Sequence, residues 1–431
     1  MALTFRGGIH HEEEALTANL PIKEMPSPDS VTLSLSGHGA DVAKPLVAVG
    51  DRVLKGQKIA DGEGNVSPIH ASISGTVSPI GTFPTPSGEE ECIVLQNDYK
   101  EELSPEVTPF DTPIGKAEPE ALIRHIREKG IVGLGGTGFP TWAKLEEAQG
   151  KVTRLIVNCA ECEPYLTGIH RLLLEKTEEV VGGVKILMRA AGVEKAVFAL
   201  EDDTEDAADA LLKLVRNSKN FAVAVLKTKY PQGDERQLVR TLLRKEIPKD
   251  DRPTSVGAIV FNAETCWAVY RAFVSGMPAT TRLLTVSGDC IKEPANLLIP
   301  MGTSFRAALD FCGGFSTKPD KLLSGGPMMG QALWSTAVPV TKKVGGILAI
   351  TAPLSKASPC IHCGRCVKAC PLQLIPSELY RSVEKGDMNT AKFYDIDLCN
   401  DCGCCTYVCP AGIPILQNIR VGKEILAKKR S

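Results

Sequence analysis

Apolar and polar positions alternate with two different periods along the middle of the chain. Three predicted helices and three predicted strands follow from them: helices over residues 121–129, 177–191 and 205–215, and strands over residues 154–157, 196–200 and 221–226. Strands that alternate with amphipathic helices indicate a doubly wound α/β domain with a parallel sheet. Ligands in such folds bind at the carboxyl ends of the strands, so these ends are the first place to look for chemistry.

The residues on either side of this region predict two smaller units. Residues 283–330 combine short strands, glycine turns and a helix over Phe305–Phe311, which indicates a small α+β unit. Residues 49–59 and 69–77 resemble the two halves of the barrel-sandwich fold of biotinyl and lipoyl domains. The intervening hairpin, residues 61–65, has no lysine to modify, so we expect the fold without its swinging arm.

Cysteine is concentrated near the C-terminus, where nine of the 15 cysteines lie between Cys360 and Cys409. Two runs there have the spacing C-x2-C-x2-C-x3-C-P, which is typical of proteins with two four-iron, four-sulfur clusters. In such proteins the last cysteine of each run ligates the other cluster. We therefore assign two ligand sets: Cys360, Cys363, Cys366 and Cys409 for one cluster, and Cys399, Cys402, Cys405 and Cys370 for the other.

A pair of zinc sites is the main alternative for these cysteines. Zinc needs only four ligands, usually from two separated C-x2-C pairs, and two complete runs that each end in proline fit that pattern poorly. Cys404 lies outside the spacing, and we expect it to be packed in the interior and not to bind iron. Residues 377–392, between the two runs, are predicted to be helical.

Bulk composition excludes several classes of protein. The net charge of -2 over 431 residues gives no indication of a nucleic-acid partner. No run of 18 apolar residues predicts a transmembrane helix, and the N-terminus has no secretory pattern. A disulfide scaffold would be short and secreted, so we expect reduced, metal-binding cysteines in the cytoplasm. Attachment to a membrane complex through another subunit remains compatible with the sequence.

The glycine-rich segment Gly133–Lys144 is the second candidate for chemistry. Glycine permits positive φ and close approach of a ligand to the backbone, and a helix that begins near Pro140 would direct free N–H groups at a phosphate. The usual dinucleotide fingerprint follows a strand, however, whereas residues 121–129 are predicted to be helical. By itself the segment is weak support for a phosphate site, and a tight structural turn is the more frequent origin of such a sequence.

Polar residues follow three predicted strands. Residues 158–164, 230–235 and 261–265 each lie at the carboxyl end of a strand. Acidic loops are usually no more than solvated surface. Three of them at equivalent strand ends, together with the glycine-rich segment, favour one shared site.

These four segments, G-L-G-G-T-G-F-P-T-W-A-K, N-C-A-E-C-E-P, Y-P-Q-G-D-E and N-A-E-T, resemble those of the flavin-binding subunit of respiratory NADH dehydrogenase and its relatives. The resemblance implies that FMN binds between the loops, with NADH stacked on the flavin. Two positions depart from the family pattern, because Leu134 replaces an arginine and Ala160 an aspartate. The resemblance implies these cofactor-binding residues: Gly133, Gly135, Gly136, Asn158, Tyr230, Glu235 and Asn262 for FMN, Phe139, Lys144 and Glu163 near NADH, and Glu161 in the same site.

The order of the predicted units resembles that of the RnfC-type component of the Rnf (or Rsx) ion-translocating oxidoreductases. The expected fold class is multidomain α/β and α+β. The expected domains are a barrel-sandwich domain in residues 1–110, a Rossmann-like FMN and NADH domain in 111–280, a β-grasp module of the soluble-ligand-binding type in 281–345, and a ferredoxin-like domain with two 4Fe-4S clusters in 346–431.

This second resemblance implies a peripheral oxidoreductase subunit on the cytoplasmic face of the cell membrane. Its partners would be other subunits of the complex, NAD(H) and, through one of those subunits, ferredoxin. Electrons would pass between NAD(H), FMN and the clusters, since a flavin joins the two-electron chemistry of nicotinamide to single-electron carriers. Two alternatives stay open: a corrinoid reductase, in which the barrel-sandwich unit follows the clusters, and a cluster relay or scaffold with a degenerate nucleotide site, which Leu134 and Ala160 suggest.

Overall fold

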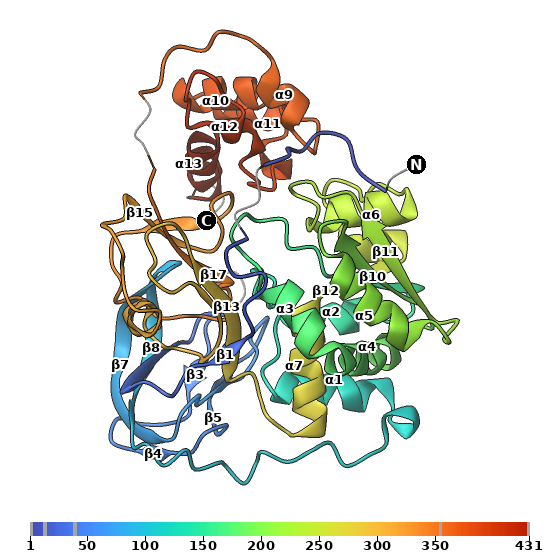
Figure 1. Ribbon diagram of the computed structural model, residues 1–431, viewed down its shortest axis with the longest axis vertical. Coiled ribbons are helices and arrows are strands. Elements are labelled where there is room, and N and C mark those ends of the chain that lie inside the picture. Colours follow the sequence, from blue (N-terminus) through green and yellow to red (C-terminus); the bar gives the residue numbers. More distant parts are fainter. Residues whose placement is uncertain (1–2, 12–14, 38–40, 353–355, 429–431) are drawn as a thin grey trace.

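The computed structural model describes residues 3–11, 15–37, 41–352 and 356–428 (Figure 1). Four structural units follow one another along the chain: a β-sandwich, a parallel α/β unit, a mixed sheet with one helix, and a helical C-terminal unit. The multidomain α/β and α+β fold class expected from the sequence is confirmed.

The N-terminal sandwich consists of two small sheets. One has the order β2-β8-β7-β4 and the other the order β3-β5-β6. Val53, Ile59 and Ile73 are fully buried in the sandwich, as expected for apolar residues on strands that face a core. The strands are β2 (Ser30–Ser34), β3 (Lys44–Pro45), β4 (Arg52–Val53), β5 (Lys58–Asp61), β6 (Ile69–His70), β7 (Gly75–Thr85) and β8 (Gly88–Asn97).

The α/β unit is built on a parallel sheet with the order β11-β10-β9-β12. Alternate residues of β9 point to opposite faces: Leu155 and Val157 pack with α4 and α7, and Ile156 packs with α6. Helices on both faces make the sheet doubly wound. The elements are α1 (Pro119–Glu128), α2 (Thr141–Ala148), β9 (Arg154–Asn158), α3 (Gly168–Glu175), α4 (Thr177–Ala191), β10 (Ala196–Glu201), α5 (Glu205–Val215), β11 (Phe221–Leu226), α6 (Glu235–Leu243), β12 (Ala258–Asn262) and α7 (Ala263–Val274).

The mixed sheet has six strands in the order β1-β14-β13-β17-β15-β16. Its edge strand β1 comes from the N-terminal part of the chain, and β17 lies beyond residue 345, so the sheet joins distant segments. The elements are β1 (Lys23–Glu24), β13 (Thr281–Ser287), β14 (Ala295–Pro300), α8 (Phe305–Phe311), β15 (Lys321–Ser324), β16 (Gln331–Leu333) and β17 (Gly346–Ile350).

The C-terminal unit is helical, and one sequence expectation about it is wrong. Residues 377–392 form two helices, because Gly386 has a φ of 72° and Asp387 then caps α11 through a 3.0 Å bond from the Thr390 N–H. The helices are α9 (Arg365–Ala369), α10 (Pro376–Glu384), α11 (Met388–Phe393), α12 (Cys404–Tyr407) and α13 (Ile415–Lys428).

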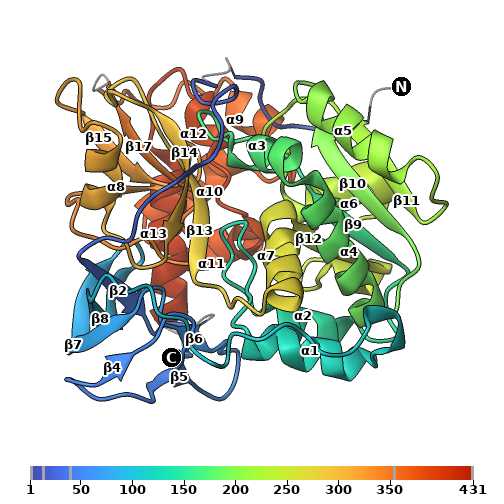
Figure 2. The same ribbon diagram turned by 60° about the horizontal axis from the view of Figure 1, so that its bottom comes forward.

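The helical unit lies above both the mixed sheet and the α/β unit in Figure 1 and between them in Figure 2. Residues 3–11, which we call the N-terminal strap, run along this junction. Leu3 pairs with Leu226 at the end of β11, and Ile9 pairs with Tyr230. The Gly8 N–H donates to the carbonyl of Ala369 at 2.8 Å. The strap therefore joins the edge of the parallel sheet to the cysteine-bearing unit.

Candidate functional site

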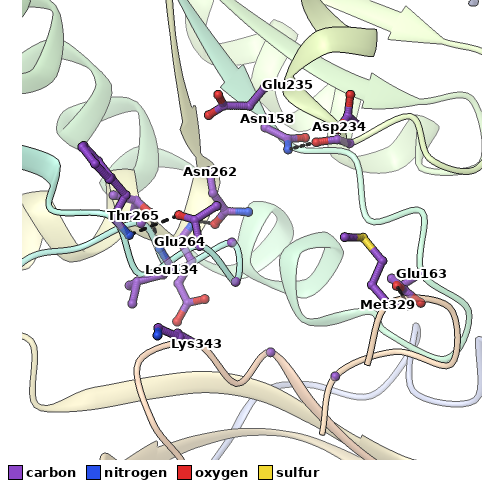
Figure 3. A pocket seen from close by; sticks show the side chains of 18 of the residues that line it. Leu134, Asn158, Glu163, Asp234, Glu235, Asn262, Glu264, Thr265, Met329 and Lys343 are labelled. Atoms are coloured by element: carbon purple, nitrogen blue, oxygen red, sulfur yellow. Dashed lines mark hydrogen bonds between the residues drawn. The ribbon is translucent and has the colours of Figure 1, made fainter. Parts of the chain in front are cut away.

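A cavity of about 760 Å³ lies between the α/β unit and the mixed sheet. In Figure 3, Asn158, Glu235 and Asn262 are on the side of the α/β unit, and Lys343 and Met329 are on the facing wall. The structure brings together in this cavity all eleven cofactor-binding residues expected from the sequence: Gly133, Gly135, Gly136, Phe139, Lys144, Asn158, Glu161, Glu163, Tyr230, Glu235 and Asn262.

Two asparagines define the floor of the cavity at the carboxyl ends of adjacent strands. Asn158 ends β9 and Asn262 ends β12, and the two residues are register partners. The Asn158 side chain donates to the Gly233 carbonyl at 2.8 Å and accepts from the Ala160 N–H at 3.1 Å. Asn262 caps α7 by accepting from the Glu264 N–H at 2.9 Å. Both amides therefore fix the loops that surround the cavity.

The glycine-rich loop, residues 133–139, forms the adjacent wall. Two backbone bonds close it, from the Gly133 N–H to the Phe139 carbonyl at 2.8 Å and from the Gly138 N–H to the Gly133 carbonyl at 3.0 Å. Three consecutive N–H groups between these bonds have no acceptor among the described residues, and all three residues line the cavity: Gly135, Gly136 and Thr137. Consecutive free N–H groups are an anion-binding arrangement of the backbone.

A buried ion pair supports this loop. Arg282 and Glu264 are only 2% and 3% exposed, and their side chains form an ion pair while Arg282 also donates to the Leu134 carbonyl. The Leu134 N–H donates to the Thr265 hydroxyl at 3.0 Å, and the Leu283 N–H donates to Glu264 at 2.9 Å (Figure 3). Burial lowers the pKa of Arg282 to about 9, so the guanidinium stays charged at neutral pH.

Two buried glutamates bind backbone N–H groups of neighbouring elements. Glu161 accepts from two N–H groups at the start of α3, at 2.8 and 3.2 Å. Glu163 accepts from the N–H groups of Met328 and Met329, at 2.9 and 2.8 Å, in the loop between β15 and β16. Burial raises the pKa of each carboxyl to about 7. Glu163 thereby joins the α/β unit to the mixed sheet at the cavity wall (Figure 3).

The residues expected near NADH form a group at one side of the cavity. Lys144 and Glu235 make an ion pair. The Arg252 guanidinium lies 4.4 Å from the ring centroid of Phe139 and pairs with Glu147 at 2.8 Å. The Phe139 ring is therefore covered by a cation that already has a partner.

The first cysteine set, which we call the outer set, surrounds a smaller cavity of about 110 Å³. Cys360 and Cys363 are exposed, and Cys366 and Cys409 are partly buried. All four line this cavity, and they are the four residues that the crossed ligation pattern predicted. Four thiolates around a small space are the donor set that a 4Fe-4S cluster requires.

The second cysteine set, Cys370, Cys399, Cys402 and Cys405, is the inner set. Cys370, Cys402 and Cys405 are each only 7–8% exposed. Burial and the charges of the other three members raise the pKa of the Cys405 thiol, so the four thiols lie close enough to interact. Such crowded thiolates are stable when bound iron balances their charge. Within the described residues, no three His, Cys, Asp or Glu side chains converge on a single-ion site.

The inner set borders the large cavity. Tyr230 lines the cavity, is 1% exposed, and donates through its hydroxyl to the Cys402 carbonyl at 2.7 Å. Asn400, which lies between Cys399 and Cys402 in sequence, also lines the cavity and donates to the Asp234 carboxylate at 3.0 Å. Two side chains therefore belong to both sites at once.

The N-terminal strap covers the same junction. A Cβ atom at Gly7 would lie 2.5 Å from the Cys370 carbonyl oxygen, so the strap backbone packs directly against an inner cysteine. The His11 imidazole lies 3.0 Å from the carbonyl oxygen of Cys162, which lines the large cavity. Cys404 is fully buried beside Tyr230, in agreement with its expected packing role.

Four family models match the chain in sequence order. They are the RnfC barrel sandwich hybrid domain over residues 3–100, the Nuo51 FMN-binding domain over 126–271, the SLBB domain over 283–332 and the 4Fe-4S dicluster domain over 359–413. The chain thus carries an FMN-binding domain and a two-cluster domain, as the sequence predicted.

Characterised relatives extend this agreement to most of the chain. The RnfC-type component of the proton-translocating ferredoxin:NAD+ oxidoreductase complex of Clostridium ljungdahlii is 43% identical over 386 residues, which cover 88% of this chain and 84% of the relative. The corresponding component of the Na+-translocating complex of Acetobacterium woodii is 39% identical over 86% of each chain. The chain belongs to the RnfC family of ion-translocating oxidoreductases. A Rhodobacter capsulatus member is 39% identical over 100% of this chain and 84% of its own length.

A solved structure shares part of the fold of this RnfC family member. An NAD+-reducing NiFe-hydrogenase in the H2-reduced state aligns with a TM-score of 0.50 and 18% identity, over 75% of this chain and 69% of that chain. The barrel-sandwich match precedes the cluster match, which is the order that distinguishes this family from the corrinoid-reductase alternative. No helix in the described part of the chain combines the length and apolarity needed to cross a membrane.

The residues present fit the cofactors of the RnfC family. Free N–H groups in a glycine loop and a cavity of about 760 Å³ suit a flavin phosphate and nucleotide, and two four-thiol sets suit two clusters. Several residues of the site were not among the predicted cofactor-binding residues: Glu264, Thr265, Arg282, Lys343 and Asn400. Arg282 had one usable signal, because it is a charged residue at the start of an apolar strand.

Proposed function

We propose that this chain exchanges electrons between NAD(H), bound with FMN in the large cavity, and the two cysteine sets. It would do so as the peripheral subunit, at the cytoplasmic face, of a membrane-bound ion-translocating ferredoxin:NAD+ oxidoreductase. The relatives named above support this role, since their printed names give the same type of complex and the same component of it. The partners are then the other subunits of that complex.

One observation carries the proposal within this chain. Tyr230 and Asn400 line the nucleotide cavity and are bonded to, or part of, the inner cysteine run. Cys360 and Cys363 of the outer set are exposed instead. Exchange between the cavity and the protein surface therefore runs through the inner set first and the outer set second. A partner subunit would meet the chain at the outer set.

The residues would divide the work of holding the cofactor. The glycine loop supplies backbone donors, and Asn158 and Asn262 fix the loops at the strand ends. FMN, when bound there, supplies the chemistry that joins a two-electron donor to one-electron carriers. Tyr230 fills the space between the cavity and Cys402, which excludes water from the shortest connection between the two sites.

The test is an anaerobic NADH titration of the iron-reconstituted chain, followed at the flavin absorbance band and by EPR of the clusters. We expect NADH to reduce the flavin and then the clusters. Cys363→Ser, in the outer set, should leave the inner cluster reducible by NADH. Cys402→Ser, in the inner set, should leave an outer cluster that dithionite reduces and NADH reduces far more slowly.

Two results would contradict the proposal. Equal NADH reduction of the outer cluster in Cys402→Ser and in the intact chain would remove the inner set from the path. A chain with both clusters that retains no flavin would instead support the relay or scaffold alternative. The second result would place the nucleotide chemistry of the complex on another subunit.

A further inference from the structure

One basic residue of the large cavity has no partner in the described part of the chain. Five basic residues line the cavity there. The side-chain nitrogen of Lys343 has no acidic or carbonyl acceptor among the described residues, whereas the other four are bonded: Lys144 to Glu235, Arg282 to Glu264, Arg252 to Glu147, and Arg236 to the carbonyls of Ile247, Pro248, Lys249 and Asp251.

Lys343 lies directly over the glycine loop. It precedes β17 in the mixed sheet and faces the loop across the cavity wall (Figure 3). A Cβ atom at Gly138 would lie 2.8 Å from Cε and 3.1 Å from Cγ of Lys343, so the lysine stem lies along this glycine. Gly138 has a φ of 64°, which also favours glycine there. The contact between the two units therefore depends on the missing side chain.

The loop beneath Lys343 is polarised to receive an anion but carries no cation of its own. The free N–H groups of Gly135, Gly136 and Thr137 are neutral donors. Leu134, which stands where the related flavin subunits have arginine, is 3% exposed and buries its side chain away from solvent. The charge that arginine would bring to the loop has to come from another segment.

We propose that Lys343, from the mixed sheet, completes a phosphate site with the free N–H groups of the glycine loop. This inference rests on the proposed function of the same cavity and assigns part of it to a residue outside the FMN-binding domain. An ammonium group next to free backbone N–H groups matches a phosphate, which accepts several charge-assisted hydrogen bonds. The phosphate belongs either to FMN or to the pyrophosphate of NAD(H).

Paired ligands with and without phosphate test the site. Binding of FMN, riboflavin, ADP-ribose and adenosine is measured by calorimetry on the cluster-loaded chain and on Lys343→Met. Loss of one charge-assisted hydrogen bond should weaken a phosphorylated ligand about tenfold to a hundredfold. Lys321→Met is the matched control, since Lys321 is an exposed lysine of the same sheet that does not line the cavity. Lys343→Arg should retain most of the binding.

The pattern of losses identifies the source of the phosphate. Weaker FMN with unchanged riboflavin assigns the site to the flavin phosphate, and weaker ADP-ribose with unchanged adenosine assigns it to the dinucleotide. Equal binding of all four ligands to Lys343→Met and the intact chain overturns the inference and leaves the proposed function standing. An intact chain that binds neither FMN nor ADP-ribose overturns the proposed function, and this inference with it.

Discussion

The nucleotide cavity and the cysteine unit are held together in opposite ways. The cysteines of both sets lie within residues 360–409, at spacings that a short motif prescribes. The cavity is lined by segments from Pro86 to Asn400, and it depends on bonds such as that between Arg282 and Leu134, 148 positions apart. A site made of local spacing is recognisable from sequence, whereas a site made of long-range contacts needs the whole fold to exist.

The two cysteine sets differ from each other as well. The outer set exposes Cys360 and Cys363, whereas the inner set is covered by the strap and by Tyr230. The same motif therefore gives one surface site and one interior site. The difference comes from what packs against each run and has no trace in the cysteine spacing.

The largest effect is expected from replacing an inner ligand. Cys402→Ser should remove one cluster, and with it roughly half of the bound iron. Cys404→Ser, two residues away and fully buried, should retain both clusters. Iron analysis and EPR of the reduced chain check this. Equal iron in the two variants would show that the motif spacing does not select the ligands.

A large loss of stability is expected from breaking the buried ion pair. Arg282→Met leaves Glu264 buried and unpaired, which should lower the free energy of unfolding by about 3–5 kcal/mol and release the glycine loop. Flavin retention should fall while iron content stays unchanged, because no cysteine depends on the pair. The measurements are denaturant unfolding and cofactor content.

Two further variants sharpen this result. Arg282→Met combined with Glu264→Leu should recover much of the loss, since no buried charge then remains. Arg240→Met breaks an exposed pair, in which Glu246 is 73% exposed, and should change stability by less than about 1 kcal/mol. A double variant as unstable as the single one would mean that the arginine acts through the Leu134 carbonyl and not through charge balance.

The smallest effect is expected from the pH dependence of Glu163. Burial raises the pKa of this carboxyl from 4.5 to about 7, so the folded chain binds more protons than the unfolded chain between these values. The free energy of unfolding should therefore fall as the pH rises from about 4.5 to about 7, by at most about 3 kcal/mol from this group.

Glu163→Gln should flatten this part of the pH profile, and Glu424→Gln, on an exposed carboxyl, should leave it unchanged. Hydrogen exchange at Met328 and Met329, corrected for intrinsic rates, should also become faster in Glu163→Gln because both N–H groups bind that carboxylate. A profile as steep as that of the intact chain would assign the pH dependence to Glu161 alone.

The sequence by itself determined the order of the units, the eight cluster ligands proposed here and the eleven residues around the cavity. Each of these follows from local rules: cysteine spacing, strand ends in a parallel sheet, and glycines at positive φ such as Gly136. The break between α10 and α11 was missed, although Gly386 marks it, because helical periodicity continues across the turn.

Only the tertiary structure decided what connects the two regions. Arg282, Lys343 and Asn400 reach the cavity from segments that no motif links to it. The packing of Tyr230 against Cys402 likewise depends on where the helical unit docks. Local sequence fixes backbone conformation over a few residues, whereas these contacts depend on the burial of distant surfaces against one another, which no short segment encodes.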